Sequence, residues 1–172
     1  MAKLLVLFDP ADDATIEVAH AIHEGARSVR FAESDLMRLP GAVDDPRAAR
    51  VRELPELDVL TAYDAIAFGG AGASLERLGQ LLRDSEPLGM SGKLANKLGS
   101  VFPVAEPATV GSEHPLWPLL APMSRYGMIL VPPGYAGPSG EPEDLVASSR
   151  RLGKRLIDIA GWIVHARSHH HH

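Results

Sequence analysis

The first twenty-five residues constrain the fold more than any other part of this 172-residue chain. A continuous apolar run at 3–8 leads into a short polar loop at 9–15, and a helical pattern of apolar residues follows up to Gly25. A fully apolar run directly before an amphipathic helix is typical of a parallel α/β sheet, in which the central strands are buried on both faces. Ligands of such sheets bind beyond the carboxyl ends of the strands, which is where the 9–15 loop lies.

The pattern of a strand followed by a helix recurs along the chain. Further strands are predicted at 28–34, 65–68, 99–102 and 128–131. Helices are predicted after them, at 74–82, 88–98, 116–126 and 143–164, with one helical turn at 46–52 inside an irregular segment, 36–56. Asp12 or Asp13 is expected to cap the first helix and Ser74 the next long one. This alternation predicts an α/β fold of the flavodoxin-like, doubly wound type, with a five-stranded parallel sheet and helices on both faces.

Composition narrows the possible functions. The length suits a single domain over 1–166, and residues 167–172 end in four histidines typical of a purification tag. The formal charge of −5 gives no basic surface for nucleic acid, and the absence of cysteine excludes disulfides and thiolate chemistry. The sequence has no run long enough for a membrane span and no signal-peptide pattern, so we expect a cytoplasmic protein without membrane contact.

Several segments of the chain resemble the WrbA family of flavodoxin-like NAD(P)H:quinone oxidoreductases. The matching segments lie at 1–7, 24–26, 63–69, 79–80, 97–102 and 126–135. The resemblance implies FMN as cofactor, held by three loops, and assembly into tetramers. Most of the matching residues belong to strands and to the turns beside them, so they support the fold more strongly than the activity.

The first of these loops departs from the family. The family positions that cradle the FMN phosphate at a helix N-terminus correspond to Pro10, Asp12 and Asp13, followed by Ala14 and Thr15. Pro10 has no N–H to donate, and the two aspartates bring negative charge toward a dianion. Two like charges about 4 Å apart repel by roughly 4 kcal/mol at an effective dielectric near 20, and each lost donor costs on the order of 1 kcal/mol.

The other two loops depart as well. The turn that would pack against the flavin ring has only small residues: Gly70, Ala71, Gly72 and Ala73. The third loop, a Ser/Thr/Gly run in the family, is matched by Pro103, Val104, Ala105 and Glu106. A histidine pair that approaches a neighbour's flavin in the family is replaced by Arg125 and Tyr126, and the segment before the last helix is shortened to 134–142.

Three departures in the same direction indicate a degenerate member of the family. We expect that FMN binding is lost or weak, that no cofactor is needed, and that the protein acts as a non-redox binding or interaction protein. The alternative is an FMN-dependent NAD(P)H:quinone oxidoreductase that uses the same positions. Whether the chain is an enzyme stays open, and the sequence identifies neither catalytic residues nor a small-molecule ligand.

Two groups of side chains have the composition of a metal site. The loop acids Asp9, Asp12 and Asp13 are compatible with Mg²⁺, but helix capping explains them without a ligand. His20, His23 and Glu24 have the spacing of one helix face, which is compatible with zinc, but no third protein ligand is evident beside the two histidines. We expect no metal.

The proline-spaced apolar stretch at 115–123 has two open interpretations. Its leucines and Trp117 are typical of a subunit interface, and they predict a homo-oligomer, a dimer more readily than a tetramer because of the shortened segment. The same residues are also consistent with ordinary packing of a helix on the sheet.

Overall fold

A computed structural model describes residues 1–10, 13–71, 73–103, 117–133 and 144–169. Its sheet has six strands, all parallel, in the order β3-β2-β1-β4-β5-β6. The strands are β1 (Ala2–Phe8), β2 (Ala32–Arg38), β3 (Arg52–Glu53), β4 (Ala65–Gly70), β5 (Leu98–Pro103) and β6 (Ile129–Leu130). The predicted parallel, doubly wound α/β fold is therefore confirmed, with one strand more than expected.

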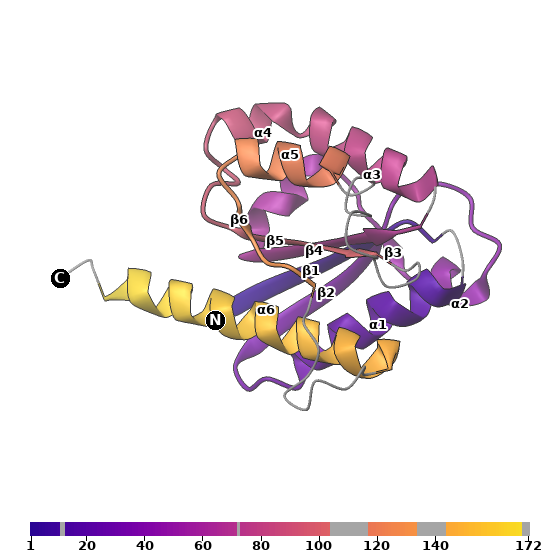
Figure 1. The fold of residues 1–172 in the computed structure, drawn as a ribbon, viewed down its shortest axis with the longest axis horizontal. Coiled ribbons are helices and arrows are strands. Elements are labelled where there is room, and N and C mark those ends of the chain that lie inside the picture. Colours follow the sequence, from indigo (N-terminus) through magenta and orange to yellow (C-terminus); the bar gives the residue numbers. More distant parts are fainter. Residues whose placement is uncertain (11–12, 72, 104–116, 134–143, 170–172) are drawn as a thin grey trace.

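Helices cover both faces of the sheet (Figure 1). One face carries α1 (Asp13–Arg27) and α6 (Leu145–Ser168), and the other carries α3 (Ala73–Asp84), α4 (Glu86–Met90) and α5 (Trp117–Arg125). A short helix, α2 (Pro46–Ala49), and a 3-10 helix, η1 (Leu57–Ala62), lie in the connections on either side of β3. No helix in the described part of the chain is long and apolar enough to cross a bilayer.

The central strand β1 is buried on both faces, as its unbroken apolar run requires. Leu4, Val6 and Phe8 point toward α1 and α6, whereas Leu5 and Leu7 point toward α3 and α5. All five side chains are fully buried. Because burial of one such side chain stabilises a fold by about 1.5–3 kcal/mol, β1 holds both layers of helices onto the sheet.

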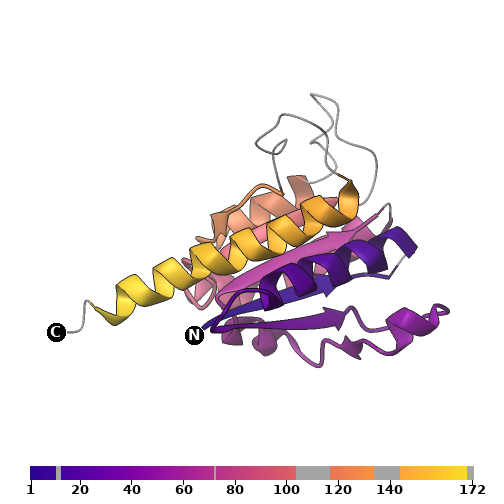
Figure 2. The ribbon, with the colours of Figure 1, turned by 90° about the horizontal axis from the view of Figure 1, so that it is seen from below.

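The two helices on one face approach each other closely, and they lie side by side in Figure 2. A Cβ atom at Gly25 of α1 would overlap the backbone carbonyl of Arg150 of α6. A Cβ atom at Gly153 of α6 would overlap the carbonyl of Ile22 of α1. Each helix therefore presents a glycine to the backbone of the other. No larger residue fits at this crossing without a shift of one helix.

The second strand was predicted four residues too early. Residues 28–31 form a turn after α1, in which the Val29 amide donates to the Ala26 carbonyl and Phe31 has a φ of +61°. The apolar side chains at 29 and 31 gave this turn the composition of a strand. The additional strand, β3, was not predicted. It is only two residues long, and it lies in the segment 36–56, which we expected to be irregular. The helical turn expected there is confirmed as α2.

Several helix boundaries also differ from the prediction. Ser74 is the second residue of α3 rather than its cap, and its amide donates to the carbonyl of Ala71. Asp13 lies inside the first turn of α1, and Asp12 lies outside the described residues. The helix expected over 88–98 is reduced to α4, because turns centred on Gly92 follow it. The last helix continues to Ser168, and the assignment of 167–172 to a tag stays a prediction.

The close crossing of α1 and α6 makes a testable prediction. Gly153→Ala should lower the melting temperature, because the added methyl group overlaps backbone that cannot rotate away; overpacking of this kind costs about 1–3 kcal/mol. Thermal unfolding followed by circular dichroism measures the effect.

Gly161→Ala is the matched control: it is on the same helix, and its Cβ would meet no described atom within 4 Å. It should leave the melting temperature unchanged or raise it, since alanine favours a helix by up to about 1 kcal/mol. Equal melting temperatures for both variants would contradict the prediction.

Candidate functional site

The carboxyl ends of β1 and β4 form the topological switch point of the sheet. The chain leaves β1 toward β2 and β3 on one side, and it returns to β4 before continuing to β5 and β6 on the other. The loops after β1 and β4 therefore diverge, and such a crevice is the usual ligand site of open α/β sheets. Asp9 and Pro10 follow β1 at this point, and Gly70 ends β4. Of the predicted cofactor loops, the structure brings the first and second together here.

An ion pair crosses this crevice. Asp9 is buried, with 5% of its surface exposed, and its Oδ1 accepts a hydrogen bond of 2.6 Å from Nη1 of Arg77 on α3. Nη2 of the same guanidinium donates to the carbonyl oxygen of Pro40, after β2, at 2.6 Å. The Asp9 amide also donates to the carbonyl of Gly69 at 3.1 Å. Arg77 thus joins three segments around the switch point by short, charge-assisted hydrogen bonds.

The small residues at the end of β4 are explained by packing. The ring of Phe102 from β5 lies where a Cβ atom of Gly69 would be. A Cβ atom at Gly70 would press against the Cβ of Ser74, which is buried. Glycine is therefore required at both positions for the close approach of neighbouring residues. Of the other predicted positions in this loop, Ala71 and Ala73 are described and Gly72 is not.

A carboxylate pair marks the N-terminus of α1. Oδ1 of Asp13 lies 3.1 Å from Nη2 of Arg47, and the same nitrogen lies 3.0 Å from Oδ2 of Asp45. Hydrogen bonds from Arg47 lower the pKa of Asp45 to about 2. Ala14 and the buried Thr15 complete this first turn. Two carboxylates thus share one guanidinium at the position where the family holds a phosphate.

These residues do not fit the phosphate of FMN. An incoming dianion would meet Asp13 at the helix start, and the nearest cation, Arg47, is already shared by two carboxylates. Pro10 offers no N–H, and the carboxylate of Asp9 lies at the crevice itself. The expected loss of FMN binding stays a prediction.

The remaining predicted positions do not join this cluster. Tyr126 is buried on the α3/α5 face and donates from its hydroxyl to the Leu82 carbonyl at 2.6 Å. Arg125 is exposed and pairs with Glu86 at 3.0 Å. Both residues precede β6, which pairs with the first residues of β5. They therefore lie at the amino ends of the strands, away from the switch point. Val104, Ala105 and Glu106 lie outside the described residues, and of Pro103 only the backbone pairing with Gly70 is described.

Several of the side chains considered as metal ligands have other partners. Nδ1 of His23 lies 2.8 Å from the Ser34 hydroxyl, Glu24 pairs with Arg150 at 3.2 Å, and Asp9 pairs with Arg77. Within the described ranges, no group of three histidine, aspartate or glutamate side chains could hold a metal ion.

Sequence reasoning missed Arg77 and Arg47. Arg77 lies beyond the four positions assigned to the second flavin loop, and Arg47 lies in the segment for which only a helical turn was predicted. A general signal was available: a carboxylate directly after a fully apolar strand is buried, and a buried carboxylate needs a cation or several donors. The identity of that cation required the fold, because Asp9 and Arg77 are 68 residues apart.

Comparison with known proteins identifies the family. An NAD(P)H dehydrogenase (quinone) from Archaeoglobus fulgidus is 31% identical over 188 aligned residues, which cover 93% of this chain and 98% of the relative. The chain belongs to the WrbA-like family of NAD(P)H:quinone oxidoreductases. No protein-family profile matches this WrbA-like chain.

Solved structures support the fold. A flavodoxin, WrbA-like protein from Agrobacterium tumefaciens aligns with 94% of this WrbA-like chain and 99% of its own, with a TM-score of 0.63 and 20% identity. A flavodoxin from the domain Archaea covers 92% and 99%, with a TM-score of 0.60 and 19% identity. At these identities the likeness establishes the flavodoxin fold alone.

Removal of Arg77 tests the ion pair at the switch point. Arg77→Gln should lower the free energy of unfolding by roughly 1–3 kcal/mol, because a buried carboxylate is left without its cation. Chemical denaturation at neutral pH measures the loss. Arg83→Gln on the same helix is the control, since Arg83 donates only to Gln80 on the surface. If both variants lose the same free energy of unfolding, the Asp9–Arg77 pair does not hold the three segments together.

His23 predicts a dependence of stability on pH. Burial lowers its pKa from the ordinary value of 6.5, so the folded state takes up its proton at lower pH than the unfolded chain does. The stabilisation is present above pH 6.5 and is lost as pH falls toward the pKa of the folded state. Melting temperatures between pH 5 and 8 should show this loss, and His23→Gln should flatten it. His20→Gln should retain it, and a flattened profile for that control would assign the effect to another group.

Proposed function

We propose that this WrbA-like protein has kept the flavodoxin scaffold without its flavin, and that it acts as a binding protein with no redox chemistry. The observation that supports the proposal is the Asp9–Arg77 ion pair, which crosses the switch point and continues to the Pro40 carbonyl. In a flavin protein this crevice has to be open to the ring. Here its two sides are joined by the chain's own side chains.

The charge at the α1 N-terminus supports the same proposal. Helix N-termini bind phosphate through free N–H groups and a favourable dipole. In this chain Asp13 stands in the first turn of α1, and it shares Arg47 with Asp45, the N-cap of α2. A phosphate at this helix start would compete with both carboxylates for the Arg47 guanidinium. Binding of the flavin ring is therefore disfavoured by the Asp9–Arg77 pair, and binding of the phosphate is disfavoured by the acids around Arg47.

The second candidate is an FMN-dependent NAD(P)H:quinone oxidoreductase. It is favoured by the family itself, since the relative from Archaeoglobus fulgidus is an NAD(P)H dehydrogenase (quinone). The two candidates predict different behaviour toward FMN, so one titration separates them.

The test is the absorbance spectrum of the purified protein, followed by titration with FMN and riboflavin. The protein should be colourless, and neither flavin should bind saturably in the micromolar range. Riboflavin is the control for the phosphate, since it carries the ring without the dianion. An FMN dissociation constant that is micromolar or tighter, or FMN-dependent reduction of a quinone by NAD(P)H, would overturn the proposal and favour the second candidate.

A further inference from the structure

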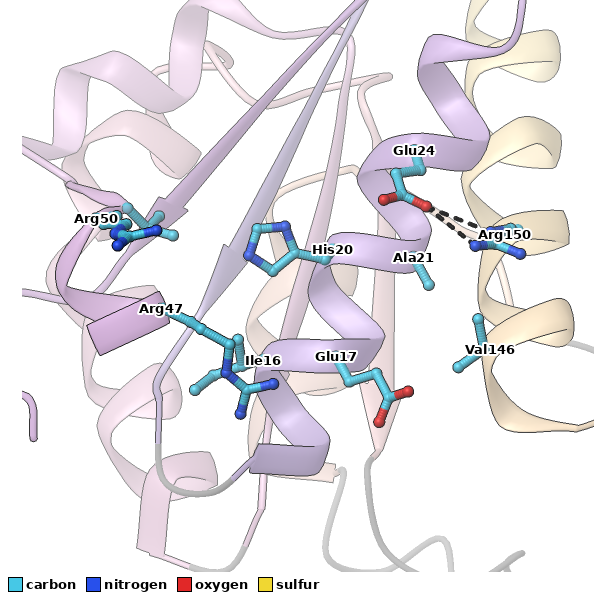
Figure 3. A pocket seen from close by; sticks show the side chains of 10 residues that line it. Ile16, Glu17, His20, Ala21, Glu24, Arg47, Arg50, Val146 and Arg150 are labelled. Atoms are coloured by element: carbon cyan, nitrogen blue, oxygen red, sulfur yellow. Dashed lines mark hydrogen bonds and ion pairs between the residues drawn. The ribbon is translucent and has the colours of Figure 1, made fainter. Parts of the chain in front are cut away.

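A separate pocket lies on the outer side of α1, away from the switch point (Figure 3). It has a volume of about 510 Å³ and is enclosed by three helical segments. Helix α1 supplies one wall, the start of α6 supplies the second, and α2 with the residues after it supplies the third. The close glycine crossing of α1 and α6 fixes two of these walls relative to each other.

The pocket has apolar surface available to a ligand. Ile16 and Ala21 of α1, Val51 after α2, and Val146 of α6 line it. Ile16 and Ala21 are buried in the fold, whereas Val51 and Val146 are half-buried. Only Val51 and Val146 therefore offer apolar surface to a ligand, and a short aliphatic chain would contact these two side chains. Removal of such a chain from water is the non-directional part of binding.

Most of the charged side chains in the pocket already have partners. Glu24 pairs with Arg150 at 3.2 Å across the mouth between α1 and α6. Arg47 is held by Asp13 and Asp45. These groups have little to gain from a ligand, because their charges are neutralised within the chain.

Two charged side chains of opposite sign differ from the rest. Arg50 and Glu17 both line the pocket, and neither makes a hydrogen bond or an ion pair with any described residue. In Figure 3 they lie on opposite sides of His20, Arg50 on the side of α2 and Glu17 on the side of α6. A guanidinium and a carboxylate are thus held apart, with the His20 side chain between them.

We propose that this pocket binds a small zwitterion with a carboxylate at one end, an ammonium at the other and an apolar chain between. The carboxylate is recognised by the Arg50 guanidinium, whose fork of N–H donors matches a carboxylate. The ammonium is recognised by Glu17. The aliphatic part lies against Val51 and Val146. This function is independent of the flavin question, because none of these groups belongs to the switch point.

The presence of both charges is what selects a zwitterion over a simple anion. An anion would gain Arg50 but would bring its charge into a pocket that also holds Glu17. A zwitterion neutralises both groups at once, and it keeps the net charge of the pocket unchanged. The separation of the two groups across His20 favours a molecule with its charges at opposite ends over one that carries both on a single carbon.

The experiment uses three probes with the same six-carbon chain: 6-aminohexanoate, hexanoate and hexylamine. Each is titrated into the ¹⁵N-labelled full chain at low ionic strength, and backbone amide shifts are followed by NMR. 6-Aminohexanoate should shift amides of α1, α2 and the start of α6 saturably. It should bind roughly two- to fivefold more tightly than either single-charge probe, which is the effect expected of one exposed ion pair.

Substitutions assign the two ends. Arg50→Gln should remove the advantage of 6-aminohexanoate over hexylamine, and Glu17→Gln should remove its advantage over hexanoate. Arg52→Gln and Glu56→Gln are matched controls, because both residues are exposed and lie outside the pocket. All four variants should keep the melting temperature of the wild type, since none of the four side chains supports the core. Equal binding of the three probes, an absence of saturable shifts at the pocket, or wild-type selectivity in Arg50→Gln and Glu17→Gln would overturn the proposal.

Discussion

The crossing of α1 and α6 is the contact on which much of this structure depends. Gly25 and Gly153 place the two helices backbone against backbone, so α6 can cover the face of the sheet that α1 leaves open. A larger residue at either position would push α6 outward and expose part of that core. The crossing also sets the distance at which Glu24 meets Arg150. The apolar core and the pocket between α1, α2 and α6 therefore share one geometric constraint.

At the switch point, polar groups of three segments are joined by contacts within the chain. In an open α/β sheet the loops after the central strands diverge, and their polar groups need partners. A bound cofactor can supply those partners. In this chain, Asp9, Arg77 and the Pro40 carbonyl supply them to one another. The cost of leaving a buried carboxylate unpaired explains why Asp9 and Arg77 act as a unit.

The sequence predicted those parts of the fold that local patterns determine. β1 was found because all its core-facing residues are apolar, and the helices of the two layers because their apolar periodicity is strong. The second strand was misplaced because the turn at Val29 and Phe31 has the composition of a strand, whereas the strand itself carries acids such as Glu33 on its exposed positions. β3 has two residues and no pattern at all. The Asp9–Arg77 pair joins distant segments, so periodicity could not reveal it. The acidic character of the first loop was visible, but the partners of its acids were not.

Arg47 connects the two regions of interest. It neutralises Asp13 at the start of α1, and the same residue lines the pocket on the outer side of that helix. The negative charge at position 13 is balanced by the guanidinium that α2 supplies. Arg47 thus contributes to both regions, through its ion pair at the start of α1 and as part of the wall of the outer pocket. Family membership fixes the scaffold, whereas such local pairings decide what it binds.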